Sequence, residues 1–256
     1  MPTTTPLTDA INALTTYANE TTGASDTDLS SAVATLVAGY GGGGTDYAPD
    51  LLMDKLTEYS SNEVTSLRRS AFRYATKIVT LNLPECLSVA TECITYMSAL
   101  EHLYLPKCKT FSSIDAISYN SKLSVLALPS ITSAINSYGF RSNGFTALDL
   151  GESFGGFITG NCLNGCTKLN TLIIRNPSVA SLPNINVFTN TPFASGKAGG
   201  TLYVPNSLIS GYQSATNWST ILGYANNSIK SIESTHTDPD APIDLTLYYA
   251  DGTPIE

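Results

Sequence analysis

A short apolar motif, typified by Leu-x-Leu-Pro, recurs along this chain at nearly constant spacing. Successive copies begin 22 to 24 residues apart, and only the last step, of 30 residues, is longer. The copies begin at Leu81, Leu103, Leu126, Leu148, Leu172 and Leu202. An apolar residue also precedes each of the first five copies by three positions. A period of this length indicates a solenoid, in which each repeat forms one coil and neighbouring coils share a core.

Strand geometry assigns each residue of the motif to a face. Alternate residues of a strand point to opposite sides, so Leu81 and Leu83 should point inward while Thr80 and Asn82 point outward. Parallel stacking of the coils then joins the leucines into one core, and Pro84 ends its strand because proline has no N–H to donate. We therefore expect an α/β solenoid of about six coils with a parallel sheet, preceded by a short N-terminal helical pair.

The details of the repeat resemble those of one branch of the leucine-rich repeats. The segment Leu100-x-x-Leu103-x-Leu105-x-x-Cys108 has the leucine-rich-repeat pattern. The Leu-x-Leu-Pro strands, the preceding turn Asn120-Ser-Lys-Leu123 and the closing Gly200-Thr-Leu-Tyr-Val-Pro205 with Trp218 resemble BspA-like repeats over residues 64–232. In the fourth coil, Gly151-Glu-Ser-Phe-Gly-Gly156 replaces the usual proline turn. The resemblance implies a surface-recognition module of a kind also found among phage and prophage structural proteins.

The chain divides into four segments. Residues 1–44 carry two apolar stripes with helical spacing and then a glycine run, and residues 45–70 alternate as a capping hairpin would. The solenoid with its C-terminal cap, in which Trp218 packs, should cover 71–232, and 233–256 form a tail with a strand-like stretch at 243–249. The stripe residues are Ile11, Leu14, Leu29, Val33 and Leu36. They either pack on each other or the first coil, or attach the chain to further copies or a larger assembly.

The five cysteines are predicted to be packing residues. Cys86 and Cys108 fall at one repeat position that continues as Ile131, which favours a buried apolar column over a disulfide or metal ladder. Cys162 and Cys166 are separated by three residues, which does not match zinc-knuckle spacing.

Composition and motifs point away from catalysis. Charged residues make up only 13% of the chain and the net charge is −8, which argues against nucleic-acid binding. The only histidines are His102 and His236, and no nucleophile, metal or phosphate-loop motif occurs. No apolar run is long enough for membrane insertion, and the N-terminus lacks the features of a secretory leader. We expect a non-enzymatic protein without cofactors or metals, made in the host cytoplasm.

The outward side chains of the sheet are the candidate binding residues. They form a weakly charged surface on which a glycan or a protein could be recognised by shape, although such side chains can also simply solvate a sheet. The candidates are Thr80, Asn82, Glu101, His102, Tyr104, Val125, Ala127, Asp149, Thr171 and Ile173.

These observations favour a phage virion protein, such as a fibre or appendage, that recognises a host-surface glycan or protein. It would also contact other virion proteins and form a homo-oligomer, for instance a trimer, through residues 1–44. The alternative is an adhesin or protein–protein interaction module at the bacterial cell surface.

Overall fold

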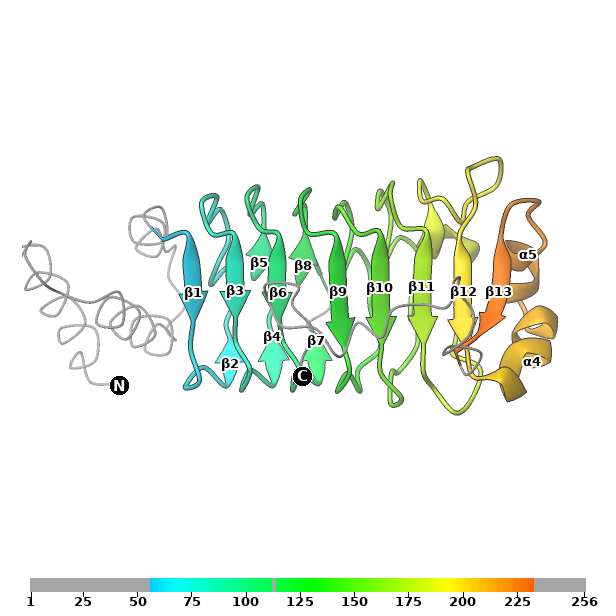
Figure 1. Cartoon of the computed structure of the whole chain (residues 1–256), viewed down its shortest axis with the longest axis horizontal. Coiled ribbons are helices and arrows are strands. Elements are labelled where there is room, and N and C mark those ends of the chain that lie inside the picture. Colours follow the sequence, from blue (N-terminus) through cyan, green and yellow to red (C-terminus); the bar gives the residue numbers. More distant parts are fainter. Residues whose placement is uncertain (1–55, 112–113, 233–256) are drawn as a thin grey trace, which may run out of the picture.

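Eight parallel strands stand in a row along the described part of the chain (Figure 1). The computed structural model describes residues 56–111 and 114–232. The strands of the row are β1 (Glu58–Ser60), β3 (Thr80–Asn82), β6 (His102–Tyr104), β9 (Val125–Leu128), β10 (Ala147–Leu150), β11 (Thr171–Ile174), β12 (Thr201–Val204) and β13 (Ser228–Ser231). Hydrogen bonds join them into two ladders, β1-β3-β6 and β9 to β13, in which every pairing is parallel. The chain is therefore a parallel-strand solenoid, as the repeat predicts.

The first leucines of the motif lie side by side in the core, as expected. Leu81 pairs with Leu103 in the first ladder. In the second ladder Leu126 pairs with Leu148, which continues to Leu172 and Leu202. These side chains are buried. The column also extends beyond the leucines, because Tyr59 pairs with Leu81 at one end and Ile229 with Leu202 at the other.

Two further sheets form the other sides of the first coils. One consists of β2 (Ser66–Leu67), β4 (Ser88–Val89) and β7 (Thr110–Phe111), and the other of β5 (Ile94–Thr95) and β8 (Ile117–Ser118). Their pairings are also parallel. Such short strands bury one or two side chains per coil, so each coil closes around the core by turns rather than by long elements.

The expected capping hairpin is wrong. The two stretches expected to form it, 56–59 and 64–67, contribute to β1 and β2, which belong to different sheets. Each pairs in parallel with the next coil, β1 with β3 and β2 with β4. The polar turn between them is a corner of the first coil, because stacking on the coil that follows buries Tyr59 and Leu67.

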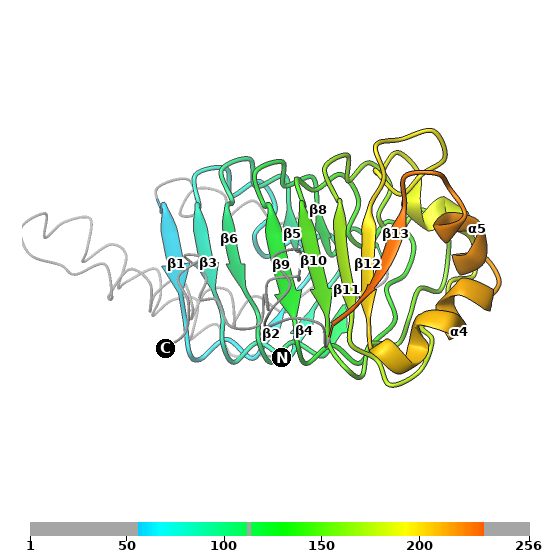
Figure 2. The same cartoon turned by 45° about the vertical axis from the view of Figure 1, so that its right-hand side comes forward.

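Aromatic side chains and short helices close the C-terminal end. The elements are η1 (Ile185–Phe188), η2 (Asn206–Leu208), α4 (Ile209–Ser214) and α5 (Trp218–Leu222), and Figure 2 shows α4 and α5 at the end of the row. Trp218 is buried with its ring centroid 5.2 Å from that of Tyr212. Its indole N–H donates to the carbonyl of Ala180 at 2.7 Å. The predicted packing role of Trp218 is confirmed.

Buried polar groups satisfy the backbone at the coil corners. Asn120 accepts a hydrogen bond from the Met97 N–H at 3.0 Å and donates to the Ile94 carbonyl. Asn143 repeats this one coil later, accepting from the Asn120 N–H at 3.1 Å. In the next coil Cys166 has the equivalent place, and its thiol donates to the Phe140 carbonyl at 3.1 Å. Each coil thus bonds the backbone of the coil before it.

All five cysteines lie within the described residues, are buried and form no disulfide. Cys86, Cys108 and Ile131 are completely buried, as the column interpretation predicts. Burial raises the pKa of Cys166 to about 12 and that of Cys162 to about 11. These thiols therefore stay protonated at neutral pH and act as hydrogen-bond donors.

Several expectations fall outside the described residues. The N-terminal helical pair with Ile11, Leu14, Leu29, Val33 and Leu36, and the strand-like stretch 243–249, are among them. Among the helices that the structure does describe, none is long and apolar enough to cross a membrane.

We predict that Leu126→Ala lowers the free energy of unfolding by about 2–5 kcal/mol, because it leaves a cavity in the continuous core. Val125→Ala on the same strand is the control, since Val125 is 38% exposed and its loss should cost less than about 1 kcal/mol. Urea denaturation of both variants measures the difference. Equal losses of unfolding free energy in the two variants would contradict the inward position of Leu126.

Candidate functional site

The outward residues of β3, β6 and β9, with Glu101 just before β6, form a partly exposed surface, which we call the open face. It consists of Thr80, Asn82, Glu101, His102, Tyr104, Val125 and Ala127. The register places Asn82 beside Tyr104 and Thr80 beside His102. Val125 is exposed and the other members are half-buried. The structure therefore brings seven of the ten predicted candidates together in a position where a partner could touch them.

Two predicted candidates, Asp149 and Ile173, differ from the others in exposure. They occupy outward positions, yet both have 0% exposure. Arg175 donates two hydrogen bonds to the Asp149 carboxylate, from Nε to Oδ1 at 2.8 Å and from Nη2 to Oδ2 at 2.7 Å. Ile173 packs with Tyr203 in a small apolar cluster on the outer face of the sheet. The alternation of inward and outward residues along a strand predicts the direction of these side chains correctly. It does not predict whether other residues cover them. Thr171, the tenth candidate, is half-buried on β11.

Charges beside the open face are paired between adjacent coils. Lys122 Nζ lies 3.0 Å from Glu101 Oε1, and Lys107 Nζ lies 2.6 Å from Glu85 Oε1. Exposed pairs of this kind contribute roughly 0–1 kcal/mol each to stability. Their main effect is to leave the open face without a strong field of either sign.

Asn82 carries an unsatisfied group on this face. Its side-chain oxygen is buried and accepts no hydrogen bond from the part of the chain that the structure describes. Buried polar atoms are nearly always bonded, so this oxygen is an unusual unsatisfied acceptor among the described residues.

A second surface, which we call the tyrosine ladder, was missed by the sequence interpretation. Tyr74, Tyr96 and Tyr119 stack in consecutive coils, with ring centroids 5.0 Å and 4.5 Å apart. Tyr96 and Tyr119 directly follow β5 and β8, so the ladder lies beside that small sheet and away from the open face. Arg73 lies 5.0 Å from the Tyr74 ring centroid and Arg141 lies 4.8 Å from that of Tyr119.

The ladder residues have left-handed backbones. The φ angles of Tyr74, Tyr96 and Tyr119 are 64°, 58° and 60°. A non-glycine residue costs roughly 1–2 kcal/mol in this conformation. Aromatic stacking and the arginine contacts each contribute about 0.5–1.5 kcal/mol and offset that cost.

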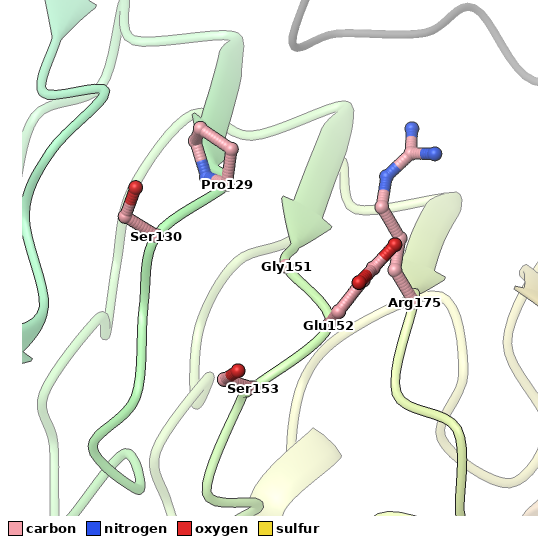
Figure 3. A pocket seen from close by; sticks show the side chains of 6 residues that line it. All are labelled: Pro129, Ser130, Gly151, Glu152, Ser153 and Arg175. Atoms are coloured by element: carbon pink, nitrogen blue, oxygen red, sulfur yellow. The ribbon is translucent and has the colours of Figure 1, made fainter.

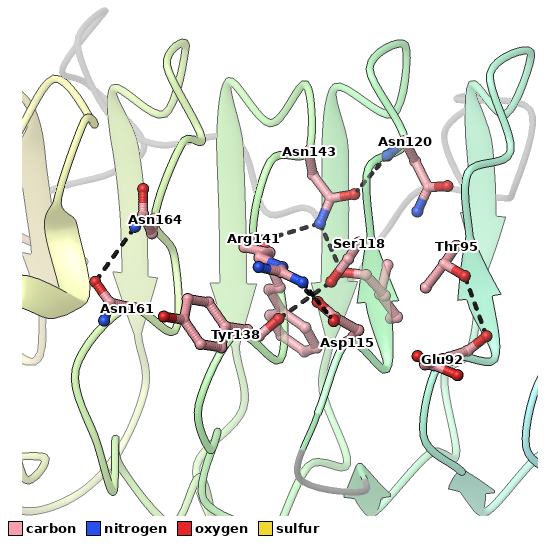
Figure 4. A network of polar contacts seen from close by, with 12 residues as sticks. Glu92, Thr95, Asp115, Ser118, Asn120, Tyr138, Arg141, Asn143, Asn161 and Asn164 are labelled. Atoms are coloured by element: carbon pink, nitrogen blue, oxygen red, sulfur yellow. Dashed lines mark hydrogen bonds and ion pairs between the residues drawn. The ribbon is translucent and has the colours of Figure 1, made fainter.

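Acidic side chains hold the arginines of the ladder in place. Arg141 donates to both carboxylate oxygens of Asp115, from Nε and Nη2, at 2.7 Å each (Figure 4). Arg73 Nη1 lies 3.0 Å from Glu92 Oε2. Glu92 and Asp115 also have left-handed φ angles and occupy equivalent corners of successive coils. The sequence did contain a signal, because the tyrosines recur at 22 and 23 residues, but a search for apolar motifs overlooked it.

A small hollow lies where β9, β10 and β11 end (Figure 3). Its lining residues are Pro129, Ser130, Gly151, Glu152, Ser153 and Arg175. Gly151 is required here, because a Cβ atom would lie 1.9 Å from the Pro129 carbonyl oxygen. This contact explains why glycine replaces proline after β10. The lining contains no histidine or cysteine, and Glu152 is its only carboxylate.

Within 56–111 and 114–232, no group of three or more His, Cys, Asp and Glu side chains is arranged to hold a metal ion.

Comparison with known proteins identifies the repeat. A family model described as BspA type leucine rich repeat region matches six copies, over residues 54–170 and 115–210. No curated protein and no solved structure matches the chain.

We predict that Tyr96→Ala lowers the free energy of unfolding by about 1–3 kcal/mol, because it removes two ring stacks. Tyr96→Gly should be no worse than Tyr96→Ala, since glycine adopts a positive φ without strain. At Tyr104, in the extended strand β6, glycine should instead be the worse of the two. Thermal denaturation of the four variants tests this, and a glycine penalty at position 96 would refute the strain argument.

Proposed function

Because the chain belongs to the BspA-type leucine-rich-repeat family, we propose that it is a recognition module that binds its partner through the open face. Repeats of this type suggest an adhesion or protein-binding role, and solenoids of leucine-rich repeats typically serve as non-enzymatic interaction scaffolds. The observation that carries the proposal is the exposure of outward side chains on three successive coils of the solenoid.

The chemistry of the open face favours a polar, weakly charged partner. Tyr104 supplies an aromatic ring with a hydroxyl group, which suits both sugar and protein contacts. Asn82 adds a half-buried amide, and Glu101 is already paired with Lys122. A host-surface glycan or protein fits this combination better than a nucleic acid does, because phosphate backbones are bound by dense Lys and Arg.

We place this module in a phage virion, as a fibre or other appendage. Residues 1–44 would supply the attachment to other virion proteins and the contacts of a homo-oligomer such as a trimer. Their apolar stripes precede a run of four glycines at 41–44, which would let the solenoid reorient on its base. The alternative, a bacterial cell-surface adhesin or interaction module, is equally compatible with the open face. In neither case does the proposal involve nucleic acid or membrane insertion.

We predict that Tyr104→Ala weakens attachment to the target at least tenfold while the melting temperature changes little. The ring is on the outer face and half-buried, so its loss opens no core cavity. Binding of the labelled full chain to bacterial cells, purified surface polysaccharides and surface proteins is the measurement. Comparing binding to the polysaccharides with binding to the proteins distinguishes a glycan partner from a protein partner.

Leu87→Ala is the matched control, because Leu87 is 43% exposed but lies beyond the turn that ends β3. Attachment unchanged by Tyr104→Ala would discard the open face. If Tyr74→Ala abolished attachment instead, the binding site would belong to the tyrosine ladder.

We predict that the full chain is an oligomer in solution and that Leu14→Asp with Leu36→Asp converts it to a monomer. The two leucines lie on the predicted apolar stripes, where a carboxylate would be buried without a partner. Light scattering gives the mass of each variant, and Thr16→Asp, on the side of the predicted helix opposite the stripe, serves as the control. A monomeric natural chain would refute the attachment role.

A further inference from the structure

The tyrosine ladder places three phenol rings face to face across adjacent coils. Tyr96 and Tyr119 are stacked with their ring centroids 4.5 Å apart and an angle of 6° between the ring planes. Tyr74 and Tyr96 are stacked at 5.0 Å and 21°. Both distances are at the short end of the range for aromatic pairs in proteins, and Tyr96 belongs to both pairs.

The backbone holds these rings in register. Thr95 pairs with Ser118 in a parallel ladder, so Tyr96 and Tyr119, which directly follow them, are also neighbours. The Tyr74 N–H donates to the Thr95 carbonyl at 2.9 Å, and the Tyr96 N–H donates to the Ser118 carbonyl at 3.2 Å. Parallel strands repeat about every 4.8 Å, which is close to the ring separations. Each ring therefore lies over the next in nearly the same orientation.

The ladder is accessible to small oxidants in solution. Tyr74 is 48% exposed, Tyr96 is 36% exposed and Tyr119 is half-buried. Tyr104 is also half-buried, but its neighbour in the first ladder of the sheet is Asn82. Access to solvent and a stacked tyrosine neighbour therefore coincide in the tyrosine ladder.

Stacked phenols have a specific oxidative chemistry. A one-electron oxidant removes an electron from a tyrosine, and the phenolic proton passes to water, which leaves a neutral phenoxyl radical. The unpaired electron occupies the π system of the ring and has high density at the ortho carbons. The lobes of that π system are perpendicular to the ring plane, so in a face-to-face stack they point at the neighbouring ring. Two radicals in such a stack are oriented to form a carbon–carbon bond.

We propose that the tyrosine ladder is a site of oxidative cross-linking, at which Tyr96 couples to Tyr119 or to Tyr74 as dityrosine. The new bond joins one ortho carbon of each ring, and the two ortho hydrogens then move to the oxygens and restore both phenols. The pair loses two electrons and two protons in total. A peroxide, acting through a peroxidase, accepts them, so that one molecule of hydrogen peroxide becomes two molecules of water.

The geometry favours the pair of Tyr96 and Tyr119, because their rings are closer and more nearly parallel than those of Tyr74 and Tyr96. Tyr138 lies in the same region but outside the stack. Arg141 lies 4.8 Å from the Tyr119 ring centroid and 4.4 Å from that of Tyr138 (Figure 4), whereas these two described rings make no contact with each other.

The cross-link joins two adjacent coils outside the apolar core. Tyr96 and Tyr119 are 23 positions apart in the sequence, so a bond between them restrains the unfolded chain as a disulfide does and stabilises the solenoid. This inference goes beyond the proposed function and does not depend on it, since the ladder lies away from the open face.

Treatment of the full chain with a peroxidase and hydrogen peroxide tests the inference. Trypsin cleaves after Lys and Arg, which places Tyr74, Tyr96 and Tyr119 in the separate peptides 74–77, 78–107 and 110–122. Mass spectrometry should find 78–107 joined to 110–122 as the main cross-linked product, with two hydrogen atoms fewer than the two peptides together. A smaller amount of 74–77 joined to 78–107 is also expected. The treated chain should melt at a higher temperature than the untreated chain.

Tyr96→Phe is the decisive variant, because it keeps a stacked ring but removes the phenol that both pairs share. We expect the yield of cross-linked 78–107 to fall at least tenfold. Tyr138→Phe is the matched control, since Tyr138 is half-buried and also contacts Arg141, and the yield should not change. Tyr104→Phe, which removes the other tyrosine of peptide 78–107, should leave the yield unchanged as well.

Three results would overturn the inference. The first is an undiminished yield in Tyr96→Phe, and the second is a yield that falls in Tyr104→Phe instead. The third is coupling mainly between two chains, seen as a dimer on a denaturing gel in place of a cross-linked monomer. None of these readouts involves the binding partner, so failure here is distinct from failure of the proposed function.

Discussion

The stacking of inward apolar side chains in exact register holds this solenoid together. A strand of three or four residues has too little apolar surface to be stable alone, and each column residue is buried only because the coils before and after cover it. Leu148 illustrates this, since it lies between Leu126 and Leu172 and has no exposed surface. The outward residues also form regular rows, because the same register that aligns the leucines aligns the residues between them.

The register imposes a cost at the corners, where the chain must turn within one or two residues. Tyr96 and Asp115 take left-handed conformations there, and Asn120 and Asn143 bond the backbone of the preceding coil. Stacked rings, forked arginine pairs and buried amides offset the strain and satisfy the polar groups that the short strands leave over. The tyrosine ladder therefore primarily stabilises the corners. Because its ring edges are exposed, it is also the alternative to the open face as a binding site.

The sequence predicted the core column and the direction of each strand residue, because both depend only on period and alternation. It failed where the outcome depends on a neighbouring coil or on a covering layer. The segment around Tyr59 alternates as a hairpin would, yet the next coil provides a better partner through Leu81. Asp149 and Ile173 point outward as predicted but are buried. The tyrosine ladder shared the leucine period and was overlooked, since its residues are neither leucines nor strand residues.

A surface built in this way is suited to recognition more than to chemistry. Catalysis needs unlike groups that converge on one point, whereas a stacked sheet presents like positions in parallel rows at a constant interval. Within such a row, specificity arises from which positions are open and which are covered. Tyr104 and Asn82 are open while Ile173 is covered. The contact residues can therefore change from coil to coil without altering the leucines beneath them, and this independence is what makes the fold a carrier of binding sites.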